Sequence, residues 1–207
     1  MGAGNGESLA GIVLGKELSG ERHWKLTVLS PEEGVVVCLW RVSHKQALEK
    51  PDLFDRAEID FGGRGGVGSG FVSNYRVLQR QPELGNDYRR LSLACRLALL
   101  VLRNPPAAGA AGQLFCLCEA ALAALAERPL PEMAYFKFLW KWMLSEGYPV
   151  REQWLGGLSE ERRGATARML RQPLDGQTET VATARDLTGR LERWMAGECH
   201  FILPDQK

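Results

Sequence analysis

A change in the spacing of apolar residues near Pro82 constrains the fold of this 207-residue chain most strongly. Before Pro82, short stretches rich in β-branched and aromatic residues alternate with turn residues, as in an all-β unit. After Pro82, apolar residues recur at helical spacing. The sequence therefore predicts an α+β protein with a β domain over residues 1–81 and an all-α helical domain over residues 82–207.

Five strands are expected in the first domain. They cover Leu9–Gly15, His23–Leu29, Val35–Arg41, Phe54–Phe61 and Phe71–Arg80. The second alternates, with Trp24, Leu26 and Val28 on one face, which suits a sheet with one buried side. Ser30–Gly34 supplies the Pro and Gly of a tight hairpin. Five short strands in about 70 residues predict a small closed barrel, and the OB-fold is the common five-stranded choice.

The helical domain is expected to contain five helices. Asn86 and Asp87 offer a cap for the first helix, which Asn104 and the two prolines after it terminate near Arg103. The other four are expected at Gln113–Glu127, Glu132–Ser145, Ser159–Arg171 and Thr178–Ala196.

The composition of the chain limits which classes of partner and which cellular compartment are expected. The chain has 26 Lys and Arg against 25 Asp and Glu, a formal net charge of +1, so bulk charge indicates neither a nucleic acid nor a membrane. Apolar runs such as Leu97–Leu102 are far shorter than the roughly 18 residues of a membrane-spanning helix. Residues 1–8 do not look like a secretory signal, and we interpret them as a frayed tail. The five cysteines mostly fall in apolar runs, so a reducing cytoplasm is the simplest compartment.

The glycine-rich segment Gly62–Gly70 resembles a phosphate-binding loop only in its glycines. No Gly-Lys-Ser/Thr ends it, and a strand follows it where a phosphate site needs a helix N-terminus. We interpret the segment as a hairpin tip, at which Arg64 could touch a nucleic-acid backbone.

The sequence offers few candidate residues for metal binding or catalysis. Cys116 and Cys118 fall in a helical stretch, where residues two apart point about 200° apart and cannot share a metal, so core packing explains them better. Cys199 and His200 lack a partner pair. Only three histidines are present, with no G-x-S-x-G elbow. No enzyme activity, metal or cofactor is therefore expected.

Basic residues cluster locally in the β domain, although its first 80 residues carry ten Lys and Arg against ten Asp and Glu. Trp24 or Trp40 could act as stacking partners beside them. The DNA-binding candidates are Arg22, Lys25, Arg41, His44, Lys45, Arg64 and Arg76. On the first helix, Arg89, Arg96 and Arg103 share one face, which is either solvated or an extension of a nucleic-acid surface.

An aromatic run over residues 135–144 has two interpretations. Its large side chains could pack between helices. They could instead leave an apolar pocket with a basic rim, suited to an acidic peptide that ends in a hydrophobic residue. The residues of that pocket would be Phe136, Lys137, Trp140 and Lys141.

The order of several short motifs resembles the RecO family of bacterial recombinational repair proteins. The motifs are Gly11–Leu14 (GIVL), Leu26–Gly34 (LTVLSPEEG), Arg41 with Lys45, Phe71–Gln79 followed by Asp87–Leu91, Gly147–Pro149 (GYP) and Leu191–Leu203. Many family members carry a four-cysteine zinc module after the GYP motif. Here Val150–Leu158 is expected to pass directly to the next helix, so the chain resembles a variant without the module.

The resemblance implies an OB-fold and a helical domain that bind single- and double-stranded DNA without catalysis. It implies that the protein promotes annealing and helps the recombinase load onto DNA coated by single-stranded-DNA-binding protein (SSB), in the bacterial cytoplasm at the nucleoid. The implied partners are DNA, a RecR-type protein and the acidic C-terminal tail of SSB. The alternative is a protein-interaction adaptor of the same architecture that has lost DNA binding.

Overall fold

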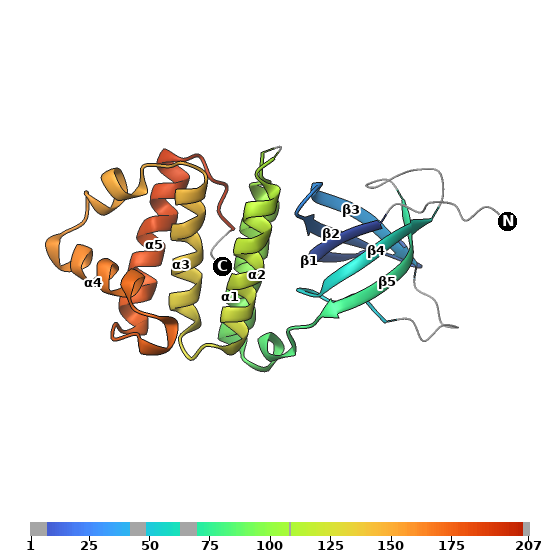
Figure 1. The fold of residues 1–207 in the computed structure, drawn as a ribbon, viewed down its shortest axis with the longest axis horizontal. Coiled ribbons are helices and arrows are strands. Elements are labelled where there is room, and N and C mark those ends of the chain that lie inside the picture. The colour runs from blue at the N-terminus through green and yellow to red at the C-terminus, as the bar shows by residue number, and fades with distance from the viewer. Residues whose placement is uncertain (1–7, 42–48, 63–69, 108, 205–207) are drawn as a thin grey trace. The chain divides into compact units, whose positions relative to one another are not determined.

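The computed structural model describes residues 8–41, 49–62, 70–107 and 109–204 (Figure 1). The chain forms two compact units. The barrel unit comprises Met1–Gln81 with Pro105–Cys116, and the helical unit comprises Pro82–Asn104 with Leu117–Lys207. The segment Pro105–Cys116, which the sequence assigns to the helical domain, thus groups with the barrel unit.

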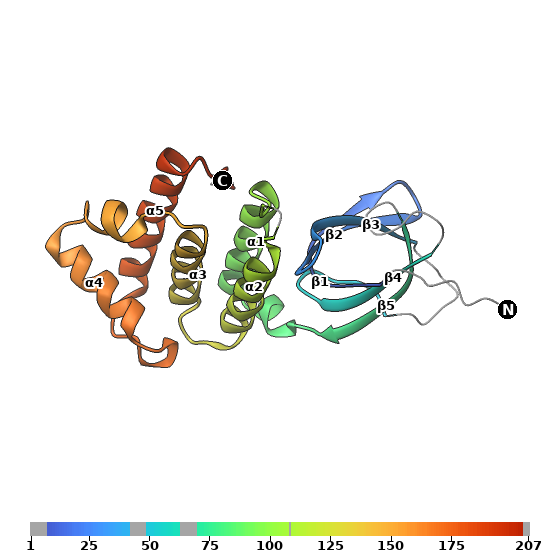
Figure 2. The same ribbon diagram turned by 45° about the horizontal axis from the view of Figure 1, so that its top comes forward.

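The five strands close into a barrel, as predicted (Figure 2). Their order around the barrel is β1-β2-β3-β5-β4. All neighbouring pairs are antiparallel except β3 and β5. The strands are β1 (Ser8–Ser19), β2 (His23–Ser30), β3 (Gly34–Arg41), β4 (Arg56–Gly62) and β5 (Phe71–Gln79). The barrel is OB-like, and helices follow it.

Alternation along the strands fills the barrel interior. Leu26 and Val28 of β2 are fully buried, which confirms the face expected to point inward. Gly11 of β1 lies where a Cβ atom would stand 2.3 Å from Cγ1 of Val28, so only glycine allows β1 to approach β2 so closely. Gly34, the first residue of β3, has a φ of 73°. This is the left-handed conformation, which glycine adopts without strain.

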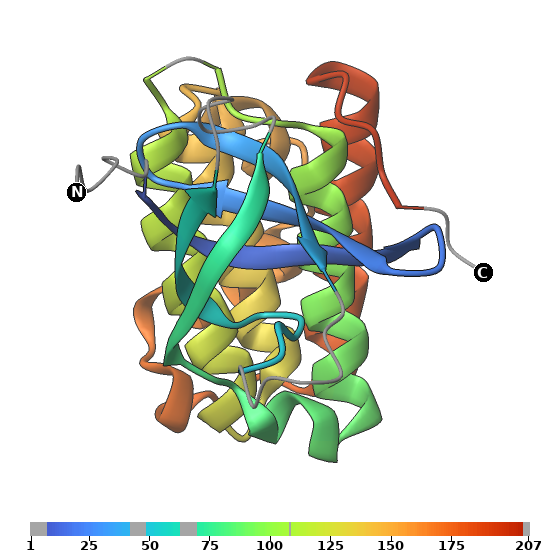
Figure 3. The ribbon, with the colours of Figure 1, turned by 90° about the vertical axis from the view of Figure 1, so that its right-hand side faces the viewer.

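The pairing of β3 differs on its two sides. Towards β2 it is continuous, from His23 opposite Arg41 to Ser30 opposite Gly34. Towards β5, within the described residues, it comprises Leu39 opposite Phe71. On its other side β5 pairs with β4 along its length (Figure 3).

The helices follow the predicted boundaries closely. Asp87 caps the first helix, its Oδ1 accepting from the backbone N–H of Arg89 at 2.7 Å. Ser159 and Thr180 cap α4 and α5 in the same manner. The helices are α1 (Tyr88–Arg103), α2 (Ala111–Glu127), α3 (Pro131–Ser145), α4 (Glu160–Arg171) and α5 (Val181–Glu198).

Three short helical segments join these elements: η1 (Pro82–Asn86), η2 (Val150–Leu155) and η3 (Leu174–Gly176). The segment η2 is a π-helical turn, where the sequence predicts a direct passage to the next helix. Its Trp154 is buried and packs against Phe136 and Trp140 of α3, at ring-centroid distances of 6.1 and 5.9 Å. Among the described residues, no helix has both the length and the apolar character needed to cross a membrane.

Candidate functional site

One end of the barrel gathers basic and aromatic side chains on its outer surface. On β2 and β3 the inward residues are buried, and alternation turns His23, Lys25, Leu39 and Arg41 outward. His23 lies opposite Arg41, and Lys25 lies opposite Leu39, which on its other side lies opposite Phe71 of β5. We call these five residues the barrel face.

The cations at this end differ in how far they are neutralised. Arg41 is exposed at the end of β3, and Arg22 is exposed in the turn between β1 and β2, beside Glu21. Neither arginine has an ion-pair partner in the part of the chain that the structure describes. Lys25 does, because its Nζ lies 3.2 Å from Oε1 of Glu17 on β1. Two guanidinium groups are therefore available to an anionic ligand.

The other DNA-binding candidates do not join them in the described structure. Arg76 lies on β5, where its guanidinium donates to the carboxylate of Glu58, the residue opposite on β4. His44, Lys45 and Arg64 lie outside the described residues. Of the seven candidates, the structure thus places Arg22, Lys25 and Arg41 at one end of the barrel.

The two tryptophans expected as stacking partners are unsuited to that role. Trp40 is only 7% exposed and belongs to the barrel core. Trp24 is half-buried against the same core, with Nζ of Lys16 5.0 Å from its ring centroid. The exposed ring at this end is instead Phe71, at 52% exposure, with the His23 ring at a centroid distance of 5.4 Å.

A register shift explains why the sequence did not predict that Phe71 faces outward. Tyr75 of β5 faces the core, and strict alternation would place Phe71 inward with it. The pairing of β4 with β5 shifts between Asp60 and Phe61, however, and Val72 becomes the residue that packs on the core. The bulge turns Phe71 to the outside.

A second feature lies wholly within the helical unit, where α1, α3 and α5 line an open cavity of about 300 Å³. Three arginines and two glutamates contribute to its wall together with tyrosines, and we call it the arginine cavity. These residues are Tyr88, Arg89, Arg96, Glu132, Tyr135, Arg185 and Glu192.

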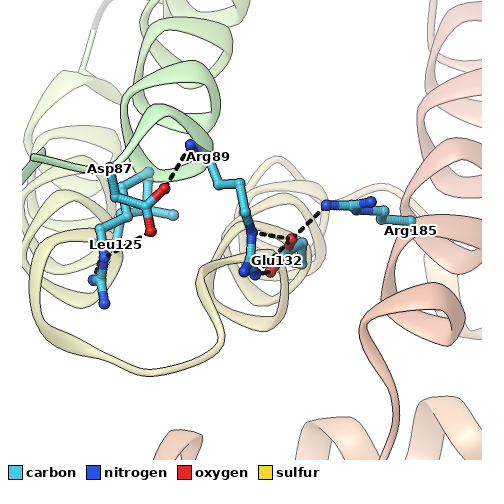
Figure 4. Close-up of polar contacts among 6 residues, drawn as sticks. Asp87, Arg89, Leu125, Glu132 and Arg185 are labelled. Carbon is cyan, nitrogen blue, oxygen red and sulfur yellow. Dashed lines mark hydrogen bonds and ion pairs between the residues drawn. The ribbon is translucent and has the colours of Figure 1, made fainter. Parts of the chain in front are cut away.

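Glu132 joins the three helices at one side of the cavity (Figure 4). Its carboxylate is almost fully buried and accepts from Nη2 of Arg89 at 2.8 Å and from Nη2 of Arg185 at 2.9 Å. Burial by itself raises the pKa of Glu132, but the hydrogen bonds from the two arginines outweigh burial and hold that pKa below its ordinary value. The carboxylate is therefore ionised at neutral pH.

Glu192 of α5 is the second buried carboxylate, at 3% exposure. Arg96 of α1 donates to it in bidentate fashion, with Nε at 2.7 Å and Nη2 at 2.9 Å. The hydroxyl of Tyr135 donates to Oε1 at 3.0 Å. Burial and then the Glu192 charge raise the pKa of Tyr135, so the phenol stays protonated and keeps donating.

The arginine stripe on α1 therefore has neither of the two roles weighed from the sequence. Arg89 and Arg96 bind buried glutamates of the helical unit. Arg103 donates from Nη1 to the backbone oxygen of Leu203 at 2.5 Å. All three side chains hold elements of the helical unit together, and the stripe is neither a simply solvated face nor a free basic surface.

The four residues expected to form a peptide pocket do not gather in one. Phe136 and Trp140 are buried beside Trp154, so the core-packing interpretation holds for both rings. Lys137 and Lys141 line a different groove of about 80 Å³ with Phe138 of α3. The Nζ of Lys137 donates to the backbone oxygen of Gln172 at 2.5 Å, and desolvation followed by the nearby Lys141 charge lowers the pKa of Lys137.

The cysteines of the helical stretch also separate. Cys118 is buried, as core packing requires, whereas Cys116 is exposed. No cluster of three or more potential metal ligands occurs in the described residues. Within the described residues, two features are the strongest candidates for binding a ligand: the barrel face with Arg22, and the arginine cavity. Comparison of the whole chain with models of protein families and with curated proteins finds no match.

Proposed function

We propose that this protein is a RecO-like mediator of DNA repair and recombination whose barrel face binds DNA without catalysis. The observation that carries the proposal is that two arginines at one end of an OB-like barrel, Arg22 and Arg41, have no ion-pair partner among the described residues. In OB-folds the surface of strands 2 and 3 and the loops beside it bind oligonucleotides. The order of motifs that resembles the RecO family supports the same function.

Binding would be electrostatic and local. The net charge of the chain is only +1, so long-range attraction is weak and affinity depends on cations placed on the face. Arg22 and Arg41 would contact phosphates and release counterions. Such contacts do not depend on base identity, which suits annealing and recombinase loading on any sequence. A RecR-type protein and SSB would be the partners.

A salt titration of binding to labelled single-stranded DNA tests this proposal. Each phosphate contact on a single strand adds about 0.7 to the slope of log affinity against log salt concentration. The double variant Arg22→Glu with Arg41→Glu should therefore lose at least tenfold in affinity at low salt and lower the slope by about 1.4.

The matched control is Arg151→Glu with Arg171→Glu, which makes the same charge change at exposed positions of the helical unit. This control should retain most of the affinity. Equal losses in both double variants would mean that net charge, and not the barrel face, governs binding. No salt-dependent binding by the wild-type protein would reject the DNA-binding function.

The arginine cavity favours a second candidate function, the protein-interaction adaptor. Arg185 is 61% exposed at its side chain, and of its guanidinium only Nη2 contacts Glu132. An acidic peptide such as the SSB tail could accept from the remaining N–H groups and place an apolar side chain in the cavity. Calorimetry with a tail peptide tests this function: saturable binding that Arg185→Ala weakens, without any DNA binding, would favour the adaptor.

A further inference from the structure

Phe71 is a large apolar side chain that the fold turns into solvent. It is 52% exposed, although the same strand buries Tyr75 to 3% exposure. The register shift opposite Asp60 and Phe61 brings Val72, and not Phe71, against the core. The exposed ring therefore contributes little to packing of the barrel, and it is free to contact a ligand.

The residues around Phe71 suit the two parts of a nucleotide, its base and its phosphate. Its ring lies beside the imidazole of His23, with centroids 5.4 Å apart and planes inclined by 55°. Across the strands, His23 lies opposite Arg41 and Leu39 lies opposite Phe71. The apolar ring thus lies opposite Leu39, two residues along β3 from Arg41, a guanidinium group without an ion-pair partner in the described residues. A nucleobase can stack on such a ring while its phosphate contacts the cation.

We propose that Phe71, with His23 beside it, stacks an unpaired nucleobase and makes the barrel face prefer single-stranded over double-stranded DNA. The inference rests on the proposed function, since it assumes that this face binds DNA. In a duplex each base is already stacked and paired, so its face cannot reach the Phe71 ring without the cost of unstacking. Duplex binding would use only the cations.

The test compares the full-length wild-type protein with Phe71→Ala, Phe71→Tyr and Leu78→Ala. Each is titrated with a labelled oligonucleotide as a single strand and as a duplex of the same length. Phe71→Ala should weaken single-strand binding about 5- to 150-fold, the range found for loss of one stacked base. Its duplex affinity and both salt slopes should stay within experimental error, because no charge is removed.

Two variants separate stacking from a general loss of apolar surface. Leu78 is a second exposed apolar residue on β5, at 45% exposure, and Leu78→Ala should change neither affinity. Phe71→Tyr keeps an aromatic face and should restore most single-strand affinity. Thermal unfolding of all three variants checks that the barrel remains intact.

The possible failures are distinguishable. If Phe71→Ala weakens single-strand and duplex binding equally, or weakens neither, the stacking role is wrong while DNA binding by the face stands. If the variant instead abolishes association with another protein chain and leaves DNA binding unchanged, the ring belongs to a protein interface and the inference is overturned. If the wild-type protein binds neither DNA, the proposed function fails and the inference fails with it.

Discussion

The arginine cavity and the end of the barrel near Arg41 use arginine in opposite ways. In the helical unit, Arg89, Arg96 and Arg185 donate to two buried glutamates and so connect three helices. In the barrel unit, Arg22 and Arg41 have no such partner among the described residues. A guanidinium bound to a buried carboxylate fixes structure, whereas one left in solvent adds little to stability and can exchange water for a ligand. The net charge of the chain is close to zero and does not reveal this difference between paired and solvent-exposed arginines.

The energetic difference between the two kinds of arginine follows from burial. A carboxylate taken out of water must be paired, and removing one partner of a buried pair is far more costly than the pair is worth. An exposed ion pair contributes at most about 1 kcal/mol. Substitutions at the arginine cavity should therefore affect stability, and substitutions of Arg22 or Arg41 should affect ligand affinity.

The largest effect is expected for Glu132→Ala. The change leaves Arg89 and Arg185 without their shared acceptor and opens a void among three helices. Because hydrogen bonds to a charged group are lost, we expect the free energy of unfolding to fall by about 3 kcal/mol, measured by urea denaturation. Asp186→Ala is the control, because Asp186 pairs with two arginines on the exposed surface; its loss should stay below about 1 kcal/mol. Similar losses for both variants would contradict the contrast between buried and exposed pairs.

Tyr135→Phe sharpens the comparison by removing one donor from Glu192 while leaving Arg96 in place. A buried hydrogen bond to a charged group contributes about 1.5 to 3 kcal/mol. The remaining bidentate arginine limits the expected loss to the lower end of that range, about 1.5 kcal/mol by denaturation. An unchanged unfolding free energy would mean that Arg96 alone satisfies Glu192.

Acid provides a smaller and reversible perturbation of the helical unit. The folded-state pKa of Glu132 lies below its unfolded value, so its stabilising contribution is complete above the ordinary glutamate pKa of about 4.3. That contribution is lost as pH falls through the lower folded-state pKa. The stability difference between wild type and Glu132→Gln should therefore be constant from about pH 6 to about 5 and shrink below about 4. A difference that grows on acidification would reverse the sign and refute the assignment.

The smallest effect on stability is expected on the barrel face. Arg41→Ala removes an exposed cation without an ion-pair partner in the described chain, and the unfolding free energy should change by no more than that of an ordinary surface variant, under about 0.5 kcal/mol. Differential scanning calorimetry of Arg41→Ala beside Arg151→Ala checks this expectation. A loss of more than about 1 kcal/mol would show that Arg41 has a structural role.

Local chemistry predicted most of the fold. The Asp87 cap, the prolines after Asn104 and the alternation of β2 locate helices and strands because these signals lie within a few residues. The arginine cavity could not be predicted, since Arg96 and Glu192 meet across 96 residues of sequence. Until helices pack together, nothing local distinguishes a buried Glu from a solvated one.

The two surface errors have different origins. The outward position of Phe71 was not predicted, because one extra residue in β5 turns its side chain from the core to the outer face of the barrel. A bulge of this kind has no reliable signature in a single sequence. The peptide pocket on α3, in contrast, could have been questioned from helix geometry alone. Phe136 and Trp140 share one face, while Lys137 and Lys141 share another about 100° away. Two aromatics and two lysines so spaced do not converge on one pocket.

The pairing of β3 also bears on how the barrel moves. A closed barrel protects its strands because each is paired on both sides, yet β3 meets β5, within the described residues, only where Leu39 lies opposite Phe71. Amide hydrogens of β3 at this seam should exchange with deuterium sooner than those paired to β2. A strand of DNA seated on Phe71 and Arg41 would bridge the seam and slow that exchange, so the same residues would report binding as a local gain in protection.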